Sequence, residues 1–457
     1  PAVLSSLEIE IAPDHGDLDA IVARRQVRML VTHDRTHFHF DGGRQAGIVA
    51  DAIVQFERWL NADLKRTRRD RIHAIVVPVP RHELIPALLA GRGDVIAMPL
   101  TETPERRRDV AFADGGRRID EVLVTRRDAR APGSVDALSG LEVHVRRGSS
   151  YHESLVALNE TFRAAGRPPV EIRLLPDDLD PDEALEMVNA GVIPATVVDS
   201  YIARAWSRRL PEIRVDEAIV LRSGAPSAWA VRKDNEELLA VVSRFARAHG
   251  PGTLWGNMKA REHFGAGDPI RNPGAAAERA RLDEVRGLMQ RYASSYSLDW
   301  LLLAAQAFQE SGLDHSRRSH VGAIGIMQLM PATARDPRVG IPDIEKLDRN
   351  IEAGTKYLRF VIDRYYAQQP MTDLDKALFA LASYNAGPAR VAKLRQEAAK
   401  SGLDPNVWFG HVEVVAARRI GAETVDYVRN IYKYYLAYRL LEDQHRSRGT
   451  MASARTT

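Results

Sequence analysis

A glutamate at the end of an apolar segment is the residue of this sequence best suited to general acid–base chemistry. Leu301, Leu302 and Phe308 have the spacing of one buried helical face. Glu310 falls in the last turn of that helix, beside Gly312. Burial near a helix C-terminus raises the pKa of a carboxyl group and keeps it protonated near neutral pH. A general acid that protonates a glycosidic oxygen needs that property.

Three further motifs follow this glutamate. Residues 322–334 read GAIGIMQLMPATA, residues 382–387 read ASYNAG and residues 423–428 read ETVDYV. The glycines of the first motif allow backbone to approach a ligand closely. Gln328 and Asn385 offer donors and acceptors for hydroxyl and acetamido groups, and the tyrosines supply flat apolar faces. Such a set suits a saccharide groove.

With Glu310-Ser311, these motifs resemble the lytic transglycosylase family of the goose-type lysozyme superfamily over about 120 residues. The resemblance implies a lyase that cleaves the β-1,4 bond between MurNAc and GlcNAc in peptidoglycan strands and leaves 1,6-anhydro-MurNAc ends. Glu310 is then the single catalytic acid and base, and the 6-hydroxyl of the substrate replaces water. The implied groove residues are Ser311, Met327, Gln328, Tyr384, Asn385, Glu423 and Tyr427.

Two alternatives stay open from the residues alone. A muramidase with a water nucleophile usually needs a second carboxylate, and the nearest acids in sequence, Asp299 and Asp314, lie outside the motifs. A non-catalytic sensor of peptidoglycan fragments would have no need of Glu310. The presence of that acid among four matching motifs favours an enzyme.

The first half of the chain resembles family 3 extracellular solute-binding domains. In amino-acid-binding members an arginine after Thr-x-Thr holds an α-carboxylate, and an aspartate of the second lobe holds the ammonium. Arg106 and Asp199 occupy those positions, and His37, Phe38 or Phe40 must supply the aromatic of the first lobe. The resemblance implies a regulatory site for an amino-acid-like or muropeptide ligand. Its carriers are the segments 91–94, 101–106, 148–151 and 198–199, and its expected ligand residues are Thr101, Arg106, Ser149, Ser150 and Asp199.

Composition excludes several other chemistries. The 457 residues contain no cysteine, and the formal net charge is +3, so thiol chemistry is excluded and nucleic-acid binding is not expected. There is no P-loop, no His-Glu-x-x-His and no Gly-x-Ser-x-Gly motif. The cluster of His33, His37 and His39 lies in a strand-to-loop segment and is not expected to bind a metal. We therefore expect no cofactor and no metal.

No apolar run reaches the ~18 residues of a membrane-spanning helix. The chain begins at Pro1 without a leader, which we interpret as a mature or truncated form. The resemblances imply a periplasmic enzyme, associated peripherally with the outer membrane in its full-length form.

Alternating strand-like and helix-like segments over residues 20–250 predict two α/β lobes, and the resemblance to family 3 solute-binding domains implies a two-lobed module of the periplasmic-binding-protein type. Long amphipathic helices from about Ala276 predict a mainly α domain, with the Glu310 helix over Trp300–Ser311, and the resemblance to lytic transglycosylases implies that this domain is lysozyme-like. We expect the two halves to fold independently because glycine and proline punctuate their connection. The predicted domains are residues 1–250, a linker at 251–280, the lytic domain at 281–443 and a disordered tail at 444–457.

Overall fold

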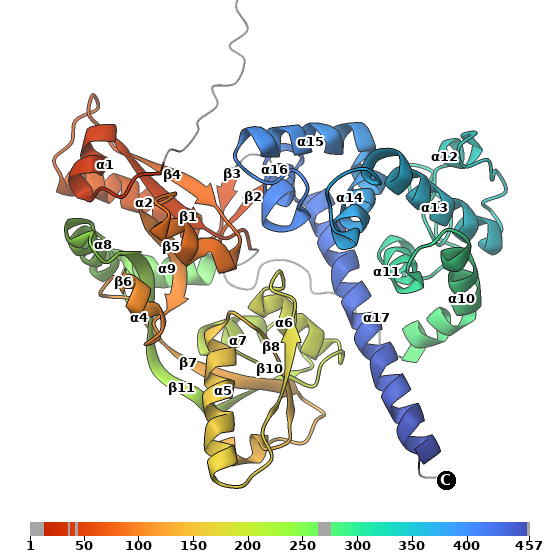
Figure 1. Ribbon diagram of the computed structural model, residues 1–457, viewed down its shortest axis with the longest axis horizontal. Coiled ribbons are helices and arrows are strands. Elements are labelled where there is room, and N and C mark those ends of the chain that lie inside the picture. The colour runs from red at the N-terminus through yellow and green to blue at the C-terminus, as the bar shows by residue number, and fades with distance from the viewer. Residues whose placement is uncertain (1–12, 35–36, 42–43, 264–275, 455–457) are drawn as a thin grey trace, which may run out of the picture.

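The computed structural model describes residues 13–34, 37–41, 44–263 and 276–454, and it places them in two α/β lobes and a helical domain (Figure 1). Two long antiparallel strands, β7 (Arg117–Arg126) and β11 (Ile213–Arg232), connect the lobes. The sheet order β4-β1-β5-β11-β7-β10-β8-β9 therefore continues through both lobes, with β6 paired to β11. The predicted two-lobed α/β module followed by a mainly α domain is confirmed.

The first lobe is built on parallel strands of mostly apolar residues, connected by helices as parallel pairing requires. Leu30 of β1 lies opposite both Val77 of β4 and Ile96 of β5. The elements of this lobe are α1 (Leu18–Arg24), β1 (Gln26–Val31), β2 (His39–Asp41), β3 (Arg44–Ala46), α2 (Ile48–Asp63), β4 (His73–Pro78), a 3₁₀ turn (Arg81–Glu83), α3 (Leu84–Leu89), β5 (Val95–Thr101), α4 (Arg106–Asp109), β6 (Val110–Phe112) and α8 (Glu236–His249).

The second lobe has β8 parallel to both β9 and β10, while β10 is antiparallel to β7. The sequence pattern does not predict β7, and within β11 it predicts only two short strands, 218–221 and 228–231. The register of β11 against β7 shifts three times between Asp216 and Ala225, and these irregularities interrupt the alternation that marks a strand. The other elements are a 3₁₀ turn (Val135–Leu138), β8 (Glu142–Arg146), α5 (Ser150–Ala164), β9 (Glu171–Leu175), α6 (Pro181–Asn189), β10 (Ala195–Asp199) and α7 (Ser200–Trp206).

A buried charge cluster serves the packing of the first lobe. Asp94 is fully buried, with its Oδ1 2.7 Å from Nη2 of Arg28 and 3.5 Å from Nη2 of Arg232. A Cβ at the preceding Gly93 would lie 2.3 Å from the side chain of Leu30, so only glycine fits there. The segment 91–94, which the sequence singled out as a carrier of the family resemblance, therefore has a structural role in this chain.

The helical domain contains every long helix that the sequence predicted in this half. Within the described residues, no helix is both long and apolar enough to cross a membrane. The elements are α10 (Ala276–Ser295), α11 (Trp300–Ser311), α12 (Pro331–Arg335), α13 (Leu347–Val361), a π turn (Ile362–Tyr366), α14 (Asp373–Ala386), α15 (Pro388–Lys400), a kinked turn (Trp408–Val412), α16 (Glu413–Ile420) and α17 (Ala422–Ala454).

The structure differs from the sequence prediction at the connection and at the tail. The predicted linker contains a further helix, α9 (Leu254–His263), and Lys259 Nζ lies 2.8 Å from the Asp51 carboxylate on α2. The beginning of the linker therefore packs as part of the first lobe, and residues 264–275 lie outside the described residues. Helix α17 continues to Ala454, past the predicted start of a disordered tail, because no proline interrupts it.

Buried ion pairs join the second lobe to the helical domain, where α6 lies beside α17 (Figure 1). The Lys433 ammonium on α17 lies 2.7 Å from the Glu186 carboxylate on α6, and both side chains are at most 1% exposed. Arg429 donates to Glu183 at 3.0 Å and to Glu413 at 2.8 Å. Independent folding of the two halves, which stays a prediction, would expose these charges to water.

We expect Lys433→Met to destabilise the full chain by about 3–5 kcal/mol, because removing one partner of a buried ion pair leaves the other uncompensated. Lys376 is the matched control, since its partner Asp373 is fully exposed, and Lys376→Met should cost less than ~1 kcal/mol. The midpoints of urea unfolding measured by circular dichroism compare the two variants. Equal shifts would contradict a stabilising role for the buried pair.

Candidate active site and ligand cleft

Helix α11 carries Glu310 in its last turn. Asp299 caps the start of the helix by accepting a hydrogen bond from the Leu301 amide at 2.9 Å. Gly312 ends the helix with a φ of 70°, a left-handed conformation that favours glycine. Residues 303–305 are fully buried, and the helix packs against α17. The bounds of α11 are those that the sequence predicted.

The carboxyl group of Glu310 has one hydrogen-bond partner in the part of the chain that the structure describes. The Tyr427 hydroxyl donates to Oε1 of Glu310 at 2.6 Å. Burial raises the pKa of Glu310 to about 7, and the hydrogen bond from Tyr427 offsets part of that increase by stabilising the carboxylate. An acid with this pKa can donate and accept a proton near neutral pH.

Gln306 is a neighbour of the acid that the sequence analysis did not identify. Its Nε2 donates to the Tyr427 hydroxyl oxygen at 3.4 Å, and its buried Oε1 has no partner among the described residues. Gln306 precedes Glu310 by four residues, so both lie on the same face of α11. A polar side chain on a buried helical face, one turn before the acid, was the available signal.

Residues 322–329 form a tight loop beside the end of α11. Ile324 and Leu329 exchange backbone hydrogen bonds at 3.0 and 3.1 Å. Gln328 has a φ of 43°, and its Nε2 donates to the Gly325 carbonyl at 2.7 Å. The predicted groove residue Gln328 therefore stabilises its own turn, and its amide oxygen accepts no hydrogen bond from the described residues.

Asn350 of α13 holds this loop and was not predicted, because it lies outside the motifs. Its fully buried side chain accepts from the Met327 amide and donates to the carbonyls of Ile324 and Ile344, each at 2.9 Å. A Cβ at Gly325 would lie 2.7 Å from Nδ2 of Asn350. This glycine is therefore required for packing inside the protein, and not for the approach to a ligand that the sequence suggested.

Three of the predicted groove residues, Ser311, Met327 and Tyr427, are buried, and the first two hold the loop. The Ser311 hydroxyl lies 3.0 Å from the Ala307 carbonyl and 2.9 Å from the Ile326 carbonyl, so it links the end of α11 to the loop. The Met327 side chain is fully buried and lies against Gly354. Both residues position the loop, and neither side chain opens onto a groove in this structure.

The second and third motifs meet near the acid. The Tyr384 hydroxyl donates to the Met327 carbonyl at 2.9 Å, and burial together with the charge of Glu310 raises the pKa of Tyr384. Asn385 accepts from Thr424 at the start of α17 at 2.7 Å, and the neighbouring Glu423 is exposed. The structure thus brings Tyr384 and Tyr427 to Glu310, while Asn385 and Glu423 lie where α14 meets α17.

Neither of the acids nearest in sequence is a second catalytic carboxylate in this geometry. Asp299 caps α11 eleven residues before Glu310, about 16 Å along the helix, and accepts from the Tyr435 hydroxyl at 2.8 Å. Asp314 accepts from the amide and hydroxyl of Ser316, and these hydrogen bonds lower its pKa. Each of these carboxylates accepts a hydrogen bond from a backbone amide two residues further along the chain.

Arg106 spans the cleft between the two lobes. Its guanidinium donates to the Thr101 carbonyl at 2.8 Å and to the Gly148 carbonyl of the second lobe at 3.2 Å. The buried residues Ser149 and Ser150 begin α5 at this point, with Ser149 as the cap. Arg106 of the first lobe therefore contacts the backbone just before Ser149 and Ser150, and protein carbonyls together with the Glu153 carboxylate, 3.6 Å away, surround its guanidinium.

Asp199 lies in a small polar cavity between the lobes, lined also by Asp34, Arg81, Tyr151 and Tyr201. Its buried Oδ1 has no hydrogen-bond partner among the described residues. Burial and a neighbouring carboxylate raise the pKa of Asp199 to about 7. A cation entering the cavity would favour the ionised form of this group.

Of the three aromatic candidates in the first lobe, His37 lines the cavity, whereas Phe38 and Phe40 pack edge to face and the Phe40 ring also lies against Arg418 of α16. Burial lowers the pKa of His33, and the described residues contain no cluster of three His, Asp or Glu side chains able to hold a metal ion. The histidine cluster is thus divided between core and cleft.

Comparison with known proteins identifies the chain. The transglycosylase SLT domain model matches residues 287–406, and the model of bacterial extracellular solute-binding proteins, family 3, matches residues 28–250. A membrane-bound lytic murein transglycosylase F of Desulfosudis oleivorans is 31% identical over 77% of this chain and 78% of that protein. The chain belongs to the membrane-bound lytic murein transglycosylase F family. A family member of Idiomarina loihiensis is 27% identical over 94% of each chain.

This family membership confirms the domain order and the class of activity that the motifs predicted. Both domain models end before elements that complete the structure of this transglycosylase F homologue, namely α9 in the first lobe and α17, which supplies Tyr427. Among solved structures, an ancestral arginine-binding protein bound to arginine is 23% identical, with a TM-score of 0.42 over 53% of this chain and 99% of that chain.

We expect Tyr427→Phe to move the basic limb of the pH–rate profile of this transglycosylase to higher pH. Glu310 must be protonated to donate, so kcat/KM of the wild type should fall as pH rises through about 7. Loss of the hydroxyl removes the hydrogen bond that favours the carboxylate and raises the pKa further. Initial rates of sacculus degradation across neutral pH measure the limb.

Tyr435→Phe is the matched control, because Tyr435 lies two turns further along α17 and donates to Asp299. Its basic limb should stay at the wild-type position. If the basic limb of the Tyr427→Phe pH–rate profile stayed in place or moved to lower pH, the hydrogen bond from Tyr427 would not be lowering the pKa of Glu310.

Proposed function

We propose that this protein cleaves the β-1,4 bond between MurNAc and GlcNAc in peptidoglycan by lytic transglycosylation, with Glu310 as its acid and base. The observation that carries the proposal is the environment of the Glu310 carboxyl group. It is buried beside Tyr427 and has a pKa of about 7. Glycan strands of peptidoglycan are the substrate, and no cofactor takes part.

Each step of the reaction uses this one carboxyl group. Protonated Glu310 donates its proton to the glycosidic oxygen while the bond from that oxygen to the anomeric carbon of MurNAc breaks, which releases GlcNAc as the leaving group. The resulting carboxylate then takes the proton of the MurNAc 6-hydroxyl, while the oxygen of that hydroxyl group bonds to the anomeric carbon. The acid is regenerated, the product ends in 1,6-anhydro-MurNAc, and no water is consumed.

The surroundings of Glu310 favour this route over hydrolysis. Glycosidases that use two carboxylates hold them roughly 5–9.5 Å apart. Burial and the Tyr427 hydrogen bond alone account for the pKa shift of Glu310, with no contribution from a second acid. A muramidase mechanism with a paired carboxylate is therefore not supported. The raised pKa also argues against a non-catalytic sensor, because binding of a neutral sugar needs no proton donor.

We assign the glycan contacts to the motif residues beside Glu310 and to those where α14 meets α17. Tyr384 and Tyr427 supply apolar faces, while the amide groups of Gln328 and Asn385 and the exposed Glu423 offer polar contacts along the strand. Ser311 and Met327 act through the loop that they hold.

We expect Glu310→Gln to lower the formation of anhydro products by at least roughly a hundredfold, because general acid–base catalysis contributes about 10²–10⁴-fold. Glutamine has nearly the same shape and cannot transfer a proton, so the variant should fold and still bind glycan. Mass spectrometry of the products released from purified sacculi measures the loss, and a melting curve verifies the fold.

Glu284→Gln is the control, since Glu284 is an exposed residue of the neighbouring helix α10. It should keep the wild-type rate. Retention of more than about a tenth of wild-type turnover by Glu310→Gln would mean that another group transfers the proton. Reducing ends in place of anhydro ends in the wild-type products would identify a hydrolase.

The interlobe cleft supports a regulatory ligand that is amino-acid-like or a muropeptide. Asp199 has a buried, unpartnered oxygen that suits an ammonium group, and Arg106 reaches both lobes with a guanidinium that suits a carboxylate. Ser149 and Ser150 at the start of α5, with Thr101 opposite, complete the polar surroundings. Binding would exchange the protein contacts of Arg106 for contacts with the ligand.

We expect Asp199→Asn to weaken binding of such a ligand by roughly 10–150-fold, the value of one hydrogen bond to a charged group. Isothermal titration of the full chain with amino acids and cell-wall peptides measures the affinity. Arg106→Ala should weaken it as well. The assignment would be wrong if both variants kept every affinity that the wild type shows.

We place the enzyme in the periplasm, at the outer membrane in its full-length form. The support is its substrate, which lies outside the cytoplasmic membrane, and the words "membrane-bound" in the names of its relatives. Fractionation of cells expressing the full-length protein would test this location.

A further inference from the structure

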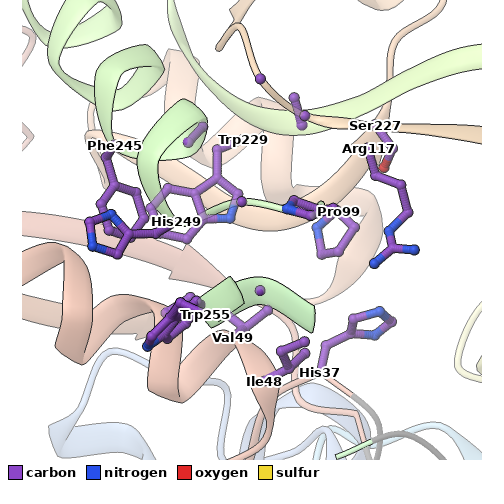
Figure 2. A pocket seen from close by; sticks show the side chains of 18 of the residues that line it. His37, Ile48, Val49, Pro99, Arg117, Ser227, Trp229, Phe245, His249 and Trp255 are labelled. Carbon is purple, nitrogen blue, oxygen red and sulfur yellow. The ribbon is translucent and has the colours of Figure 1, made fainter. Parts of the chain in front are cut away.

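A second cavity lies in the first lobe, next to the polar interlobe cavity and separate from the acid. It measures about 150 Å³, is partly open to solvent and is lined by residues of α2, α8, α9 and the strands β5, β7 and β11 (Figure 2). A cavity of this size accommodates a body as large as a benzene ring. Tyr201 of the second lobe forms part of its wall, so the cavity is built from both lobes.

The walls of this cavity are mostly apolar and aromatic. Trp229, Phe245 and Trp255 come from β11, α8 and α9, and Ile48 and Val49 come from α2. No aspartate or glutamate is among the lining residues, so an ammonium group would find no carboxylate there. The walls suit a flat apolar ring and disfavour a zwitterion.

Arg117 provides the positive charge of the cavity. Its guanidinium stacks over the Tyr201 ring at 4.8 Å and, within the described residues, makes no ion pair or hydrogen bond. Figure 2 shows Arg117 and Ser227 at one end, with Phe245, His249 and Trp255 toward the other. A half-buried cation without a counter-charge, at the end of an apolar cavity, suits a carboxylate.

Two buried polar atoms of the lining also have no partner among the described residues, Oγ of Ser227 and Nδ1 of His249. Nε2 of His249 lies 3.1 Å from the amide nitrogen of Gln55. That nitrogen can only donate, so Nε2 accepts and the neutral ring carries its proton on Nδ1. The aromatic end of the cavity therefore holds an unused donor, and unsatisfied buried groups of this kind are rare in folded proteins.

We propose that this cavity is a second ligand site of the solute-binding module, for a small aromatic carboxylate. The carboxylate lies at Arg117 and Ser227, and the ring lies among the tryptophans. A hydrogen-bond acceptor on the far edge of the ligand ring, such as a hydroxyl oxygen, accepts a hydrogen bond from Nδ1 of His249. Neither Glu310 nor Asp199 lines the cavity, so it is separate from the reacting carboxyl group. His37, Pro99 and Tyr201 line both this cavity and the one that holds Asp199, so the two ligand sites adjoin.

Isothermal titration of the full chain with 4-hydroxyphenylacetate tests the proposal, with its neutral analogue 4-hydroxyphenylacetamide as the matched ligand. We expect the wild type to bind the acid and to bind the amide at least roughly tenfold more weakly, since the charge-assisted contact is lost. Arg117→Gln should weaken binding of the acid by a similar factor and leave binding of the amide unchanged. Ala52→Phe, which fills the cavity from α2, should abolish binding of both ligands.

Arg118→Gln is the control variant, because the adjacent Arg118 already donates to the Gly224 carbonyl at 2.8 Å. It should bind the acid as the wild type does. No binding by the wild type at millimolar acid, or equal binding of acid and amide, would overturn the proposal. So would unchanged affinity in Ala52→Phe, since the probe would then bind elsewhere. The comparison of acid with amide in the wild type keeps the test decisive if Arg117→Gln fails to fold.

Discussion

The hydrogen bond between Tyr427 of α17 and Glu310 of α11 connects residues that lie 117 positions apart in the chain, and it holds a half-buried carboxyl group against a buried tyrosine. Desolvation alone would leave the carboxyl group with little tendency to ionise, while a fully hydrated glutamate would hold no proton at neutral pH. The bond from Tyr427 opposes burial, and their balance gives a pKa of about 7. One group can then serve both halves of a proton transfer.

Helix α17 supplies more than this hydroxyl group. It carries Tyr427 toward α11, and Arg429 and Lys433 toward the carboxylates of α6 in the second lobe. The same rigid element therefore contributes to the surroundings of the acid and to the buried charges between the two halves. Loop 322–329 is fixed in a comparable way from another helix. Asn350 of α13 forms hydrogen bonds with two backbone groups of the loop and with the Ile344 carbonyl outside it.

Local patterns were sufficient to predict the helix that bears Glu310 and the order of the domains, and they single out Glu310 as the candidate acid. Glu310 and Tyr427 lie in short motifs, and the parallel strands are dense in apolar residues, so both can be found without knowing which segments meet. Gln306 left a local signal that was overlooked, whereas Asn350 and the unpartnered oxygen of Asp199 could not be found in this way. Their roles depend on burial and on partners distant in sequence. Helix α9 was missed because glycine and proline around it resemble a linker.

The position of α9 has a consequence for recombining this module with other proteins. Trp255 and Gly256 of α9 form part of the aromatic cavity, although the solute-binding family match ends at Gly250. A chimera joined at Gly250 would lack one wall of that cavity and leave Trp229 and Phe245 facing solvent. A junction placed after His263 keeps the wall, so the unit that can be transplanted is longer than the unit that sequence similarity recognises.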